Sequence, residues 1–122
     1  MDLHESGEMY LETILTLKGK NQYVRSIDIA MALNYSKPSV SRAIKLLKES
    51  NLITIDEKGY IDFTQAGKDI AEGVYDRHQV LTKLLTIVGV SDSVAENDAC
   101  RIEHIICEET YQCIKDFVQK QS

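Results

Sequence analysis

The chain has 122 residues, of which 43% are apolar and 27% are charged. This length allows one domain or two small ones, and this composition is typical of a folded protein rather than a disordered one. No apolar run is long enough to cross a bilayer, and the N-terminal sequence MDLHESGEMY has no signal-peptide pattern. These features predict a cytoplasmic protein that does not span a membrane.

Charge is unevenly distributed along the chain. The net charge is −5, and residues 71–122 hold five basic and nine acidic side chains. Residues 36–48, in contrast, hold four basic side chains and no acidic one. A basic segment in an acidic protein is a candidate contact for a phosphate backbone, although a solvated helix face has the same composition.

The first part of the chain has the pattern of two helices and a turn. Apolar residues at helical spacing predict a helix over residues 3–18, which Gly19 is expected to end. Ser26 is the expected N-cap of a short second helix, and Asn34 and Tyr35 are expected to form a tight turn after it. The apolar face expected for the second helix consists of Ile27, Ala30, Met31 and Leu33.

A third helix and a hairpin are expected to follow. Ser36 can cap the third helix, with Pro38 in its first turn, where a missing N–H costs nothing. Its expected buried stripe consists of Val40, Ile44 and Leu47. The segment LITIDEKGYIDFT alternates apolar and polar residues on both sides of residues 57–59, which predicts two strands. Together these elements predict a winged helix-turn-helix, a fold that favours DNA binding but also occurs in proteins that never contact DNA.

The second half of the chain is expected to be entirely helical. Thr64 is the expected N-cap of a long helix that ends at Gly89, and Ser93 with Glu96 forms the expected capping box of the next helix. A last helix is predicted over about residues 108–120. Its expected apolar side consists of Tyr111, Ile114, Phe117 and Val118.

These helices carry more apolar surface than they can bury among themselves, which predicts a homodimer. The fold class expected is therefore mainly α with a small β-hairpin. We expect a winged helix-turn-helix DNA-binding domain over residues 1–64 and a helical metal-binding and dimerisation domain over residues 65–122.

The segment NDACRIEHIICEE, residues 97–109, carries three kinds of metal-binding side chain. Residues three and four positions apart are neighbours on a helix, so Cys100, Glu103 and His104 are expected to share one face, with Cys107 one turn further on. A thiol, a carboxylate and an imidazole converging from one helix suggest half of a metal site. A zinc site built from Cys100, His104 and Cys107 alone is the competing interpretation, although Cys107 is more simply a small buried apolar residue.

Residues elsewhere in the chain could complete such a site. Met9 and Glu12 are three residues apart on the first helix, and His78 lies in the segment YDRHQVL of the long helix. Each of these residues alone is more simply a core or surface residue. The three cysteines of the chain lie within residues 100–113, and their odd number predicts reduced thiols rather than a disulfide framework.

The order of these elements and five motifs resemble the diphtheria toxin repressor and manganese transport regulator family. The motifs are EMYLETI, SVSRAIKLLKESNLI, FTQAGKDIA, YDRHQVL and NDACRIEH, and the likeness extends from residue 6 onward. Members are dimeric, metal-dependent transcriptional repressors, so the resemblance implies a DNA-binding protein that is not an enzyme. It also implies the short form of the family, without the SH3-like domain of the longer iron regulators.

The resemblance implies a primary and a second metal site. A backbone carbonyl near Cys100 also contributes to the primary site of the family. By motif position, the primary ligands are Met9, Cys100, Glu103 and His104, and those of the second site are Glu12, His78 and Glu96.

Two sulfur ligands distinguish this chain from the manganese regulators of the family. Those regulators have carboxylates at the positions of Met9 and Cys100, whereas the iron-responsive branch has sulfur residues. Mn²⁺ prefers hard oxygen donors, so the mixed set favours Fe²⁺, with Mn²⁺, Co²⁺, Ni²⁺ and Zn²⁺ as alternatives. At the second site Thr82 stands where the iron-responsive branch has a glutamate, and Glu96 where it has a histidine.

The resemblance also implies a palindromic double-stranded DNA operator near metal-uptake genes, and no organic small-molecule substrate is expected. A metalloenzyme is disfavoured because the chain has no HExxH motif, nucleophile elbow or Gly-rich phosphate loop. A metal-free winged-helix module that binds another protein or a small ligand remains the alternative. By family position, the residues expected at DNA are Ser36, Lys37, Pro38, Ser39, Ser41, Arg42, Lys45 and Lys48, with Lys58 of the wing.

Overall fold

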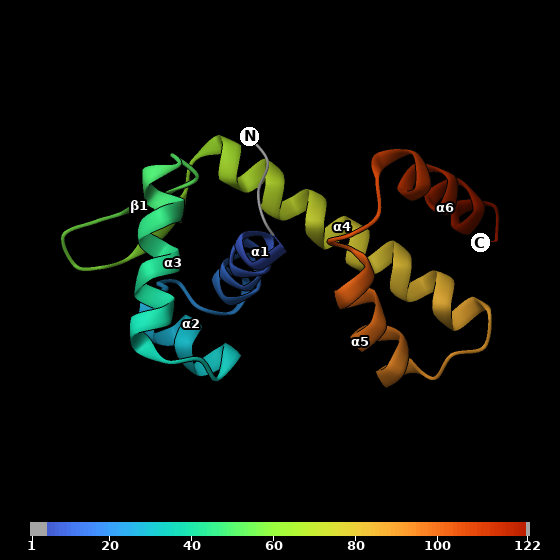
Figure 1. Cartoon of the computed structure of the whole chain (residues 1–122), viewed down its shortest axis with the longest axis horizontal. Coiled ribbons are helices and arrows are strands. Elements are labelled where there is room, and N and C mark those ends of the chain that lie inside the picture. The colour runs from blue at the N-terminus through green and yellow to red at the C-terminus, as the bar shows by residue number, and fades with distance from the viewer. Residues whose placement is uncertain (1–4, 122) are drawn as a thin grey trace. The chain divides into compact units, whose positions relative to one another are not determined.

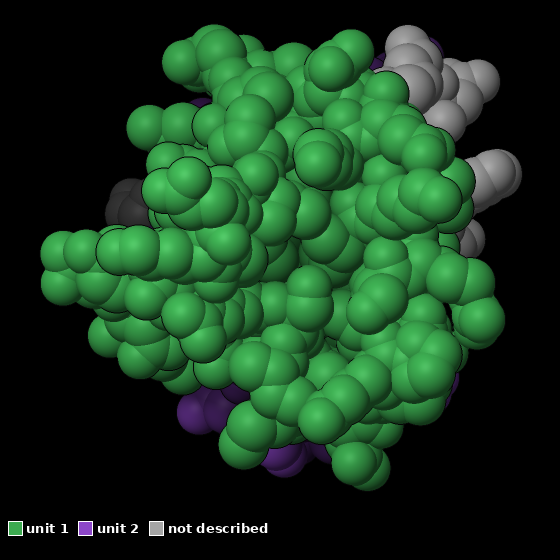
Figure 2. Space-filling view, turned by 90° about the vertical axis from the view of Figure 1, so that its left-hand side faces the viewer, with its two compact units in different colours: residues 1–72 green, residues 73–122 purple. Residues whose placement is uncertain are grey.

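The computed structural model describes residues 5–121, which form six helices and one two-stranded hairpin (Figure 1). The chain divides into two compact units, Met1–Glu72 and Gly73–Ser122, and Figure 2 shows the surface of the first unit in green. None of the helices described has the length and apolar character needed to span a membrane. The elements are α1 (Glu5–Lys20), α2 (Ser26–Leu33), α3 (Lys37–Glu49), β1 (Ile53–Ile55), β2 (Ile61–Phe63), α4 (Gln65–Ile87), α5 (Asp92–Ile102) and α6 (Glu108–Lys120).

The first unit is built around α1, α2 and α3, which pack against one another. Leu11 of α1, Ile29 of α2 and Val40 of α3 have no exposed surface. The stripe predicted for the third helix is confirmed, because Ile44 and Leu47 are buried as well. Each such side chain stabilises the fold by about 1.5–3 kcal/mol through removal of its apolar surface from water.

The helix α1 passes through Gly19 and ends at Lys20, where the N–H of Asn21 donates to the carbonyl of Leu17 at 2.8 Å. The prediction that Gly19 ends this helix is therefore wrong. A glycine inside a helix lowers the stability of that helix by about 1 kcal/mol relative to alanine. The hydrogen bonds of the neighbouring turns can offset this cost. Leu3, part of the predicted helix, lies outside the described residues.

The start and the buried face of α2 also differ from expectation. Arg25, not Ser26, is the N-cap, because its backbone N–H donates to Asp28 Oδ2 at 2.8 Å. A carboxylate accepts such a bond more strongly than a hydroxyl does. The buried residues include Ile29, whereas Ile27 is 39% exposed and Met31 is 75% exposed. Six apolar residues in eight positions allow two overlapping apolar faces, so periodicity alone could not select the buried one.

The turn before α3 agrees with the sequence. Asn34 adopts the left-handed conformation, with φ of 57°, which ends α2. Ser36 then caps α3, since its Oγ accepts the backbone N–H of Ser39 at 3.3 Å, and Pro38 lies in the first turn. These features complete the predicted helix-turn-helix.

The predicted hairpin is confirmed by the antiparallel pairing of β1 and β2. In its turn, Asp56 Oδ1 accepts the backbone N–H groups of Lys58 and Tyr60, each at 2.9 Å. Gly59 has φ of 83°, a left-handed conformation that favours glycine. The register pairs Ile53 with Phe63, Thr54 with Asp62 and Ile55 with Ile61.

The start of α4 is docked onto the chain that leads into the hairpin. Thr64 caps α4 as predicted, because its Oγ1 accepts the N–H of Gly67 at 3.1 Å and donates to the carbonyl of Asn51 at 2.7 Å. A Cβ atom on Gly67 would lie 1.8 Å from the carbonyl oxygen of Leu52. Glycine is therefore required at this position by close approach of two backbones.

In the second unit, polar side chains of α4 hold the segment that leads into α6. Arg77 Nη1 donates to the carbonyl of Ile106 at 3.0 Å, and Arg77 Nη2 lies 2.7 Å from Glu108 Oε2. The hydroxyl of Tyr111 donates to Asp76, and this hydrogen bond lowers the pKa of the Asp76 carboxyl. Burial, together with the same carboxylate, raises the pKa of Tyr111, which keeps the phenol as a donor.

The end of α4 has the two hydrogen bonds of a Schellman motif. Gly89 has φ of 106°, its N–H donates to Thr86, and the N–H of Val90 donates to Leu85 at 2.9 Å. Gly89 is thus the C-terminal stop that the sequence predicted.

The next helix, α5, begins two residues before its predicted capping box. Ser91 is the N-cap, its carbonyl accepts the N–H of Ala95 at 2.8 Å, and Asp92 lies in the first turn. An acidic residue there is favoured by the helix dipole, so Asp92 competes with the box expected from Ser93 and Glu96. The prediction of that box is wrong.

The second unit leaves several large apolar side chains exposed. On α6, Tyr111 and Val118 are buried as predicted, but Phe117 is 46% exposed. Val88 and Ile105 are exposed by 66% and 67%. Apolar side chains exposed in this way are available for contact with a partner chain.

Candidate metal site and DNA-binding helix

The helix that carries the predicted ligands is shorter than expected. It ends at Ile102, and Glu103 is its C-cap, with helical backbone angles and an N–H that donates to Ala99 at 2.9 Å. His104 lies in the turn that follows, and Cys107 is the exposed N-cap of α6. The predicted single face extending from Cys100 to Cys107 is wrong, because the chain leaves its helical course after Glu103.

This geometry also removes the basis of the competing zinc site. Cys107 is exposed rather than buried, and its Sγ lies 3.5 Å from Thr110 Oγ1. The hydrogen bond with Thr110 lowers the pKa of the Cys107 thiol. The helical face that Cys100, His104 and Cys107 were expected to share does not form in the described part of the chain.

A buried carboxylate lies between two imidazoles in the second unit. Glu103 is 1% exposed, its Oε2 lies 2.8 Å from His78 Nδ1, and its Oε1 lies 3.3 Å from His104 Nε2. His78 comes from α4, whereas the other two residues come from the end of α5. A buried carboxylate is costly unless it has partners, and the imidazole of His78 supplies a hydrogen bond to Oε2.

The donor set of this cluster fits a divalent transition metal. Carboxylate oxygen and imidazole nitrogen are common ligands of Fe²⁺, Mn²⁺ and Zn²⁺. Because Glu103 Oε1 already lies 3.3 Å from His104 Nε2, little rearrangement is needed to direct these two side chains toward one ion. The residues present therefore fit the kind of group that the sequence predicts.

The other predicted ligands come from α1 and α5. Cys100 and Glu96 occupy exposed positions on α5. Met9 and Glu12 are half-buried on α1 in the first unit, and Met9 Sδ accepts a hydrogen bond from the hydroxyl of Tyr35 at 3.8 Å. The structure thus brings His78, Glu103 and His104 together within the second unit.

Two residues that contact the surroundings of these predicted ligands had no signal in the sequence. Arg77 holds the carbonyl of Ile106, in the segment that follows His104, and Tyr35 holds Met9. Neither contact has a sequence signal, because each joins residues 26 or more positions apart. The hydroxyl of Thr82 donates to the carbonyl of His78 at 2.7 Å, so it is engaged by the helix backbone.

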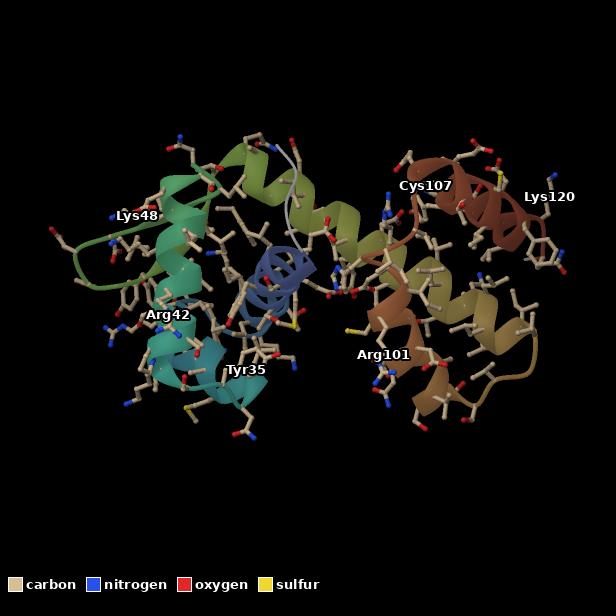
Figure 3. All side chains as sticks on the ribbon, in the orientation of Figure 1. Tyr35, Arg42, Lys48, Arg101, Cys107 and Lys120 are labelled. Carbon is tan, nitrogen blue, oxygen red and sulfur yellow. The ribbon has the colours of Figure 1, made fainter. Side chains whose placement is uncertain are left out.

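One side of α3 is exposed and basic. Arg42 and Lys48 lie on this helix (Figure 3). Arg42 Nη2 is 3.5 Å from Ser39 Oγ, which in turn accepts from the hydroxyl of Ser36 at 2.8 Å. Among the residues predicted to contact DNA, Ser39 is half-buried, and the exposed ones are Ser36, Lys37, Pro38, Ser41, Arg42, Lys45, Lys48 and Lys58.

Two family profiles together cover almost the whole chain. Residues 2–65 match the profile described as "Iron dependent repressor, N-terminal DNA binding domain". Residues 64–121 match the one described as "Iron dependent repressor, metal binding and dimerisation domain". The chain belongs to the iron-dependent repressor family. The protein is thus a metal-dependent, DNA-binding transcriptional repressor and not an enzyme, and members of its family dimerise through the C-terminal domain.

Individual relatives agree with this assignment. The repressor is 32% identical over 111 residues to the transcriptional regulator MntR of Escherichia coli O6:H1, covering 91% of this chain and 72% of that one. It is 26% identical to the IdeR structure from T. acidophilum, with a TM-score of 0.79, covering 95% of this chain and 54% of that one.

Another structure, the hypothetical protein SSo2273 from Sulfolobus solfataricus, shares the fold. Its TM-score is 0.74 at 23% identity, and the match covers 97% of this chain and 91% of that one. The predicted fold class and family are confirmed by these comparisons. The two profiles are named for iron, whereas a further neighbour with a TM-score of 0.81 and 22% identity is described as the manganese regulator SloR.

Proposed function

We propose that this repressor responds to Fe²⁺ and controls metal-uptake genes in the cytoplasm. Residues 1–64 serve as the DNA-binding domain, and residues 65–122 serve as the metal-binding and dimerisation domain. The observation that carries the proposal is the buried Glu103, whose carboxylate lies between the imidazoles of His78 and His104. Soft sulfur donors at Met9 and Cys100 favour Fe²⁺ over Mn²⁺.

The primary metal site would use one ligand from α1 and the rest from the end of α5. Glu103 would act as a hard anionic ligand whose position His78 maintains, and His104 as a neutral nitrogen ligand. When bound, the ion supplies a positive charge that neutralises the buried carboxylate and links the ligand-bearing helices. The proposed ligands are Met9, Cys100, Glu103 and His104.

A second site would use Glu12, His78 and Glu96. The hydrogen bond between His78 and Glu103 supports this assignment, because it joins a proposed ligand of the second site to a proposed ligand of the primary site. Thr82 would not contribute a side-chain ligand here, since its hydroxyl is bonded to the backbone of His78.

At the DNA, the exposed side of α3 would enter the major groove, and Lys58 would reach a phosphate from the wing. A homodimer presents two such helices, which fits a palindromic operator. The ion activates DNA binding if the ligands bind it more tightly in the DNA-competent arrangement of the repressor than in other arrangements. That difference in affinity shifts the population of repressor molecules toward the DNA-competent arrangement.

The test begins with an operator selected from a random duplex library by the metal-loaded wild-type protein. DNA affinity is then measured anaerobically with Fe²⁺, Mn²⁺, Co²⁺, Ni²⁺ and Zn²⁺. We expect Fe²⁺ to activate binding at the lowest concentration. Stronger activation by Mn²⁺ or Zn²⁺ would assign a different ion to the same fold, and equal binding with and without ions would favour a metal-free module.

Removal of one ligand tests the site itself. His104→Ala should abolish activation by Fe²⁺, because an imidazole ligand is lost, while the protein stays a folded dimer. Circular dichroism and sedimentation check the fold and the dimer. Gln79→Ala, at an exposed position beside His78, is the matched control and should keep activation. Normal activation of His104→Ala would contradict the ligand assignment.

A further inference from the structure

The thioether proposed as a metal ligand is held by a hydroxyl in the first unit. Met9 Sδ accepts a hydrogen bond from the hydroxyl of Tyr35 at 3.8 Å, within the range for sulfur acceptors. A methionine side chain has three rotatable bonds, so contact with a fixed hydroxyl restricts the positions of its sulfur. A thioether has two lone pairs, so one hydrogen bond leaves it able to bind a soft cation.

Tyr35 is fixed at both its backbone and its ring. Its backbone N–H donates to the carbonyl of Ala30 at 3.1 Å, which attaches it to the last turn of α2. Its ring packs edge-on against Tyr10, with ring centroids 6.3 Å apart and an interplanar angle of 68°. Tyr10 is only 6% exposed, so the ring of Tyr35 rests against the core of the unit. Tyr35 is labelled in Figure 3, at the turn between α2 and α3.

The residue that follows Tyr35 is the N-cap of the DNA-binding helix. Ser36 Oγ accepts the N–H of Ser39 and so fixes the first turn of α3. Because Tyr35 and Ser36 are consecutive, a shift of Tyr35 moves this first turn. Met9, Tyr10, Tyr35 and Ser36 all lie in the first compact unit.

We propose that Tyr35 couples the Met9 thioether to the position of α3. Met9 offers one sulfur both to the Tyr35 hydroxyl and to the ion, so the side-chain position that metal binding selects also sets the position of Tyr35. Tyr35 passes this restraint to Ser36 and the first turn of α3. This inference rests on the proposed function, because it requires Met9 to be a ligand. The coupling is reciprocal: DNA must raise metal affinity by the same factor by which metal raises DNA affinity.

The test variant is Tyr35→Phe, which removes the hydroxyl and keeps the ring against Tyr10. The matched control is Tyr23→Phe, in the same unit. Tyr23 is 53% exposed, and its hydroxyl accepts a hydrogen bond from Gln22 at 3.2 Å. In metal-free proteins labelled with ¹³C at the methionine methyl groups, the Met9 signal should shift in Tyr35→Phe and stay unchanged in Tyr23→Phe.

The second readout is the ratio of DNA affinities with and without Fe²⁺, measured anaerobically on the selected duplex. In Tyr35→Phe this ratio should fall by about threefold to tenfold, within the range found for substitutions that lie between coupled sites. DNA affinity of the metal-free variant should equal that of the wild type. Reciprocity requires that DNA raise the Fe²⁺ affinity of the variant by the same reduced factor.

Three results would overturn the coupling role while leaving the proposed function intact. The first is an unchanged Met9 signal, and the second is an unchanged affinity ratio. The third is equal weakening of DNA binding with and without Fe²⁺, which would make Tyr35 a direct DNA contact. A wild-type protein that no ion activates would overturn the proposed function as well, because a coupling residue then has nothing to transmit.

Discussion

At the scale of single residues, the donor atoms of Met9 and Cys100 carry the assignment of the metal. Both are sulfur atoms, whereas Glu103 and His104 offer oxygen and nitrogen. A thioether contributes little to the binding of Mn²⁺, which prefers hard oxygen donors. Selectivity between iron and manganese should therefore depend on two side chains.

Replacing both sulfur residues tests this dependence. The double variant Met9→Asp with Cys100→Glu should raise the response to Mn²⁺ relative to Fe²⁺, because its ligands are all oxygen or nitrogen. Added negative charge strengthens binding of every divalent ion, so the ratio of half-activating Mn²⁺ and Fe²⁺ concentrations is the quantity to measure. Ser93→Asp with Asn97→Asp, at two exposed positions on α5, controls for the two added charges. A wild-type ratio in the double variant would contradict the role of sulfur.

Candidate ligand residues could be named from the sequence, but the contacts that hold them in place could not. Spacing placed Cys100, Glu103 and His104 within one segment, and residue type suggested their chemistry. The roles of Arg77 and Tyr35 could not be predicted, because the residues that they contact, Ile106 and Met9, lie far away in the sequence. Side-chain contacts across tertiary structure leave no periodic signal in the sequence.

At the scale of elements, three of the predicted helix ends are confirmed and three are wrong. Ser36 and Thr64 cap α3 and α4 as predicted, and Gly89 ends α4. The predictions failed at Gly19, which α1 passes through, and at Ser26 and Ser93, where a carboxylate competed with a hydroxyl. Cap residues act locally, whereas the buried face of a short helix is decided by the elements that pack on it.

The close approach at the start of α4 gives a prediction about stability. Gly67→Ala should lower the free energy of unfolding by about 1–3 kcal/mol, because a Cβ atom there overlaps the carbonyl of Leu52. Gly73→Ala, in the same helix, is the matched control, since a Cβ at that position meets nothing within 4 Å. The control should be neutral or more stable by up to about 1 kcal/mol, because alanine favours the helix. Urea unfolding followed by circular dichroism measures both, and equal stabilities would contradict the steric argument.

At the scale of the whole molecule, dimerisation doubles every contact with DNA. The second unit exposes Val88, Ile105 and Phe117, which suits a chain whose family dimerises through this part. Each phosphate contact contributes about −0.9 to the slope of log affinity against log salt. A residue that contacts phosphate in both subunits therefore contributes about twice that amount.

Salt dependence can locate the DNA surface on this basis. Arg42→Ala and Lys45→Ala should each weaken binding and reduce the magnitude of the salt slope by about 1.8 units. Lys83→Ala removes the same charge from an exposed position in the second unit and should leave the slope unchanged. Affinity on the selected duplex between low and moderate salt gives the slopes. Unchanged slopes for both α3 variants would move the interface to another surface.

The boundary between the two compact units falls inside α4, after Glu72. The first two turns of this helix belong to the winged-helix unit, where Gly67 touches Leu52 and Ala71 is fully buried in the core. An evolutionary exchange of this module between regulators would therefore have to carry those two turns with it. A crossover placed at the end of the hairpin would expose apolar core residues of the donor module. It would also join the recipient module to two helical turns that do not fit its core. Recombination in such a protein is constrained to points within a continuous helix, where both parents must keep the same helical phase.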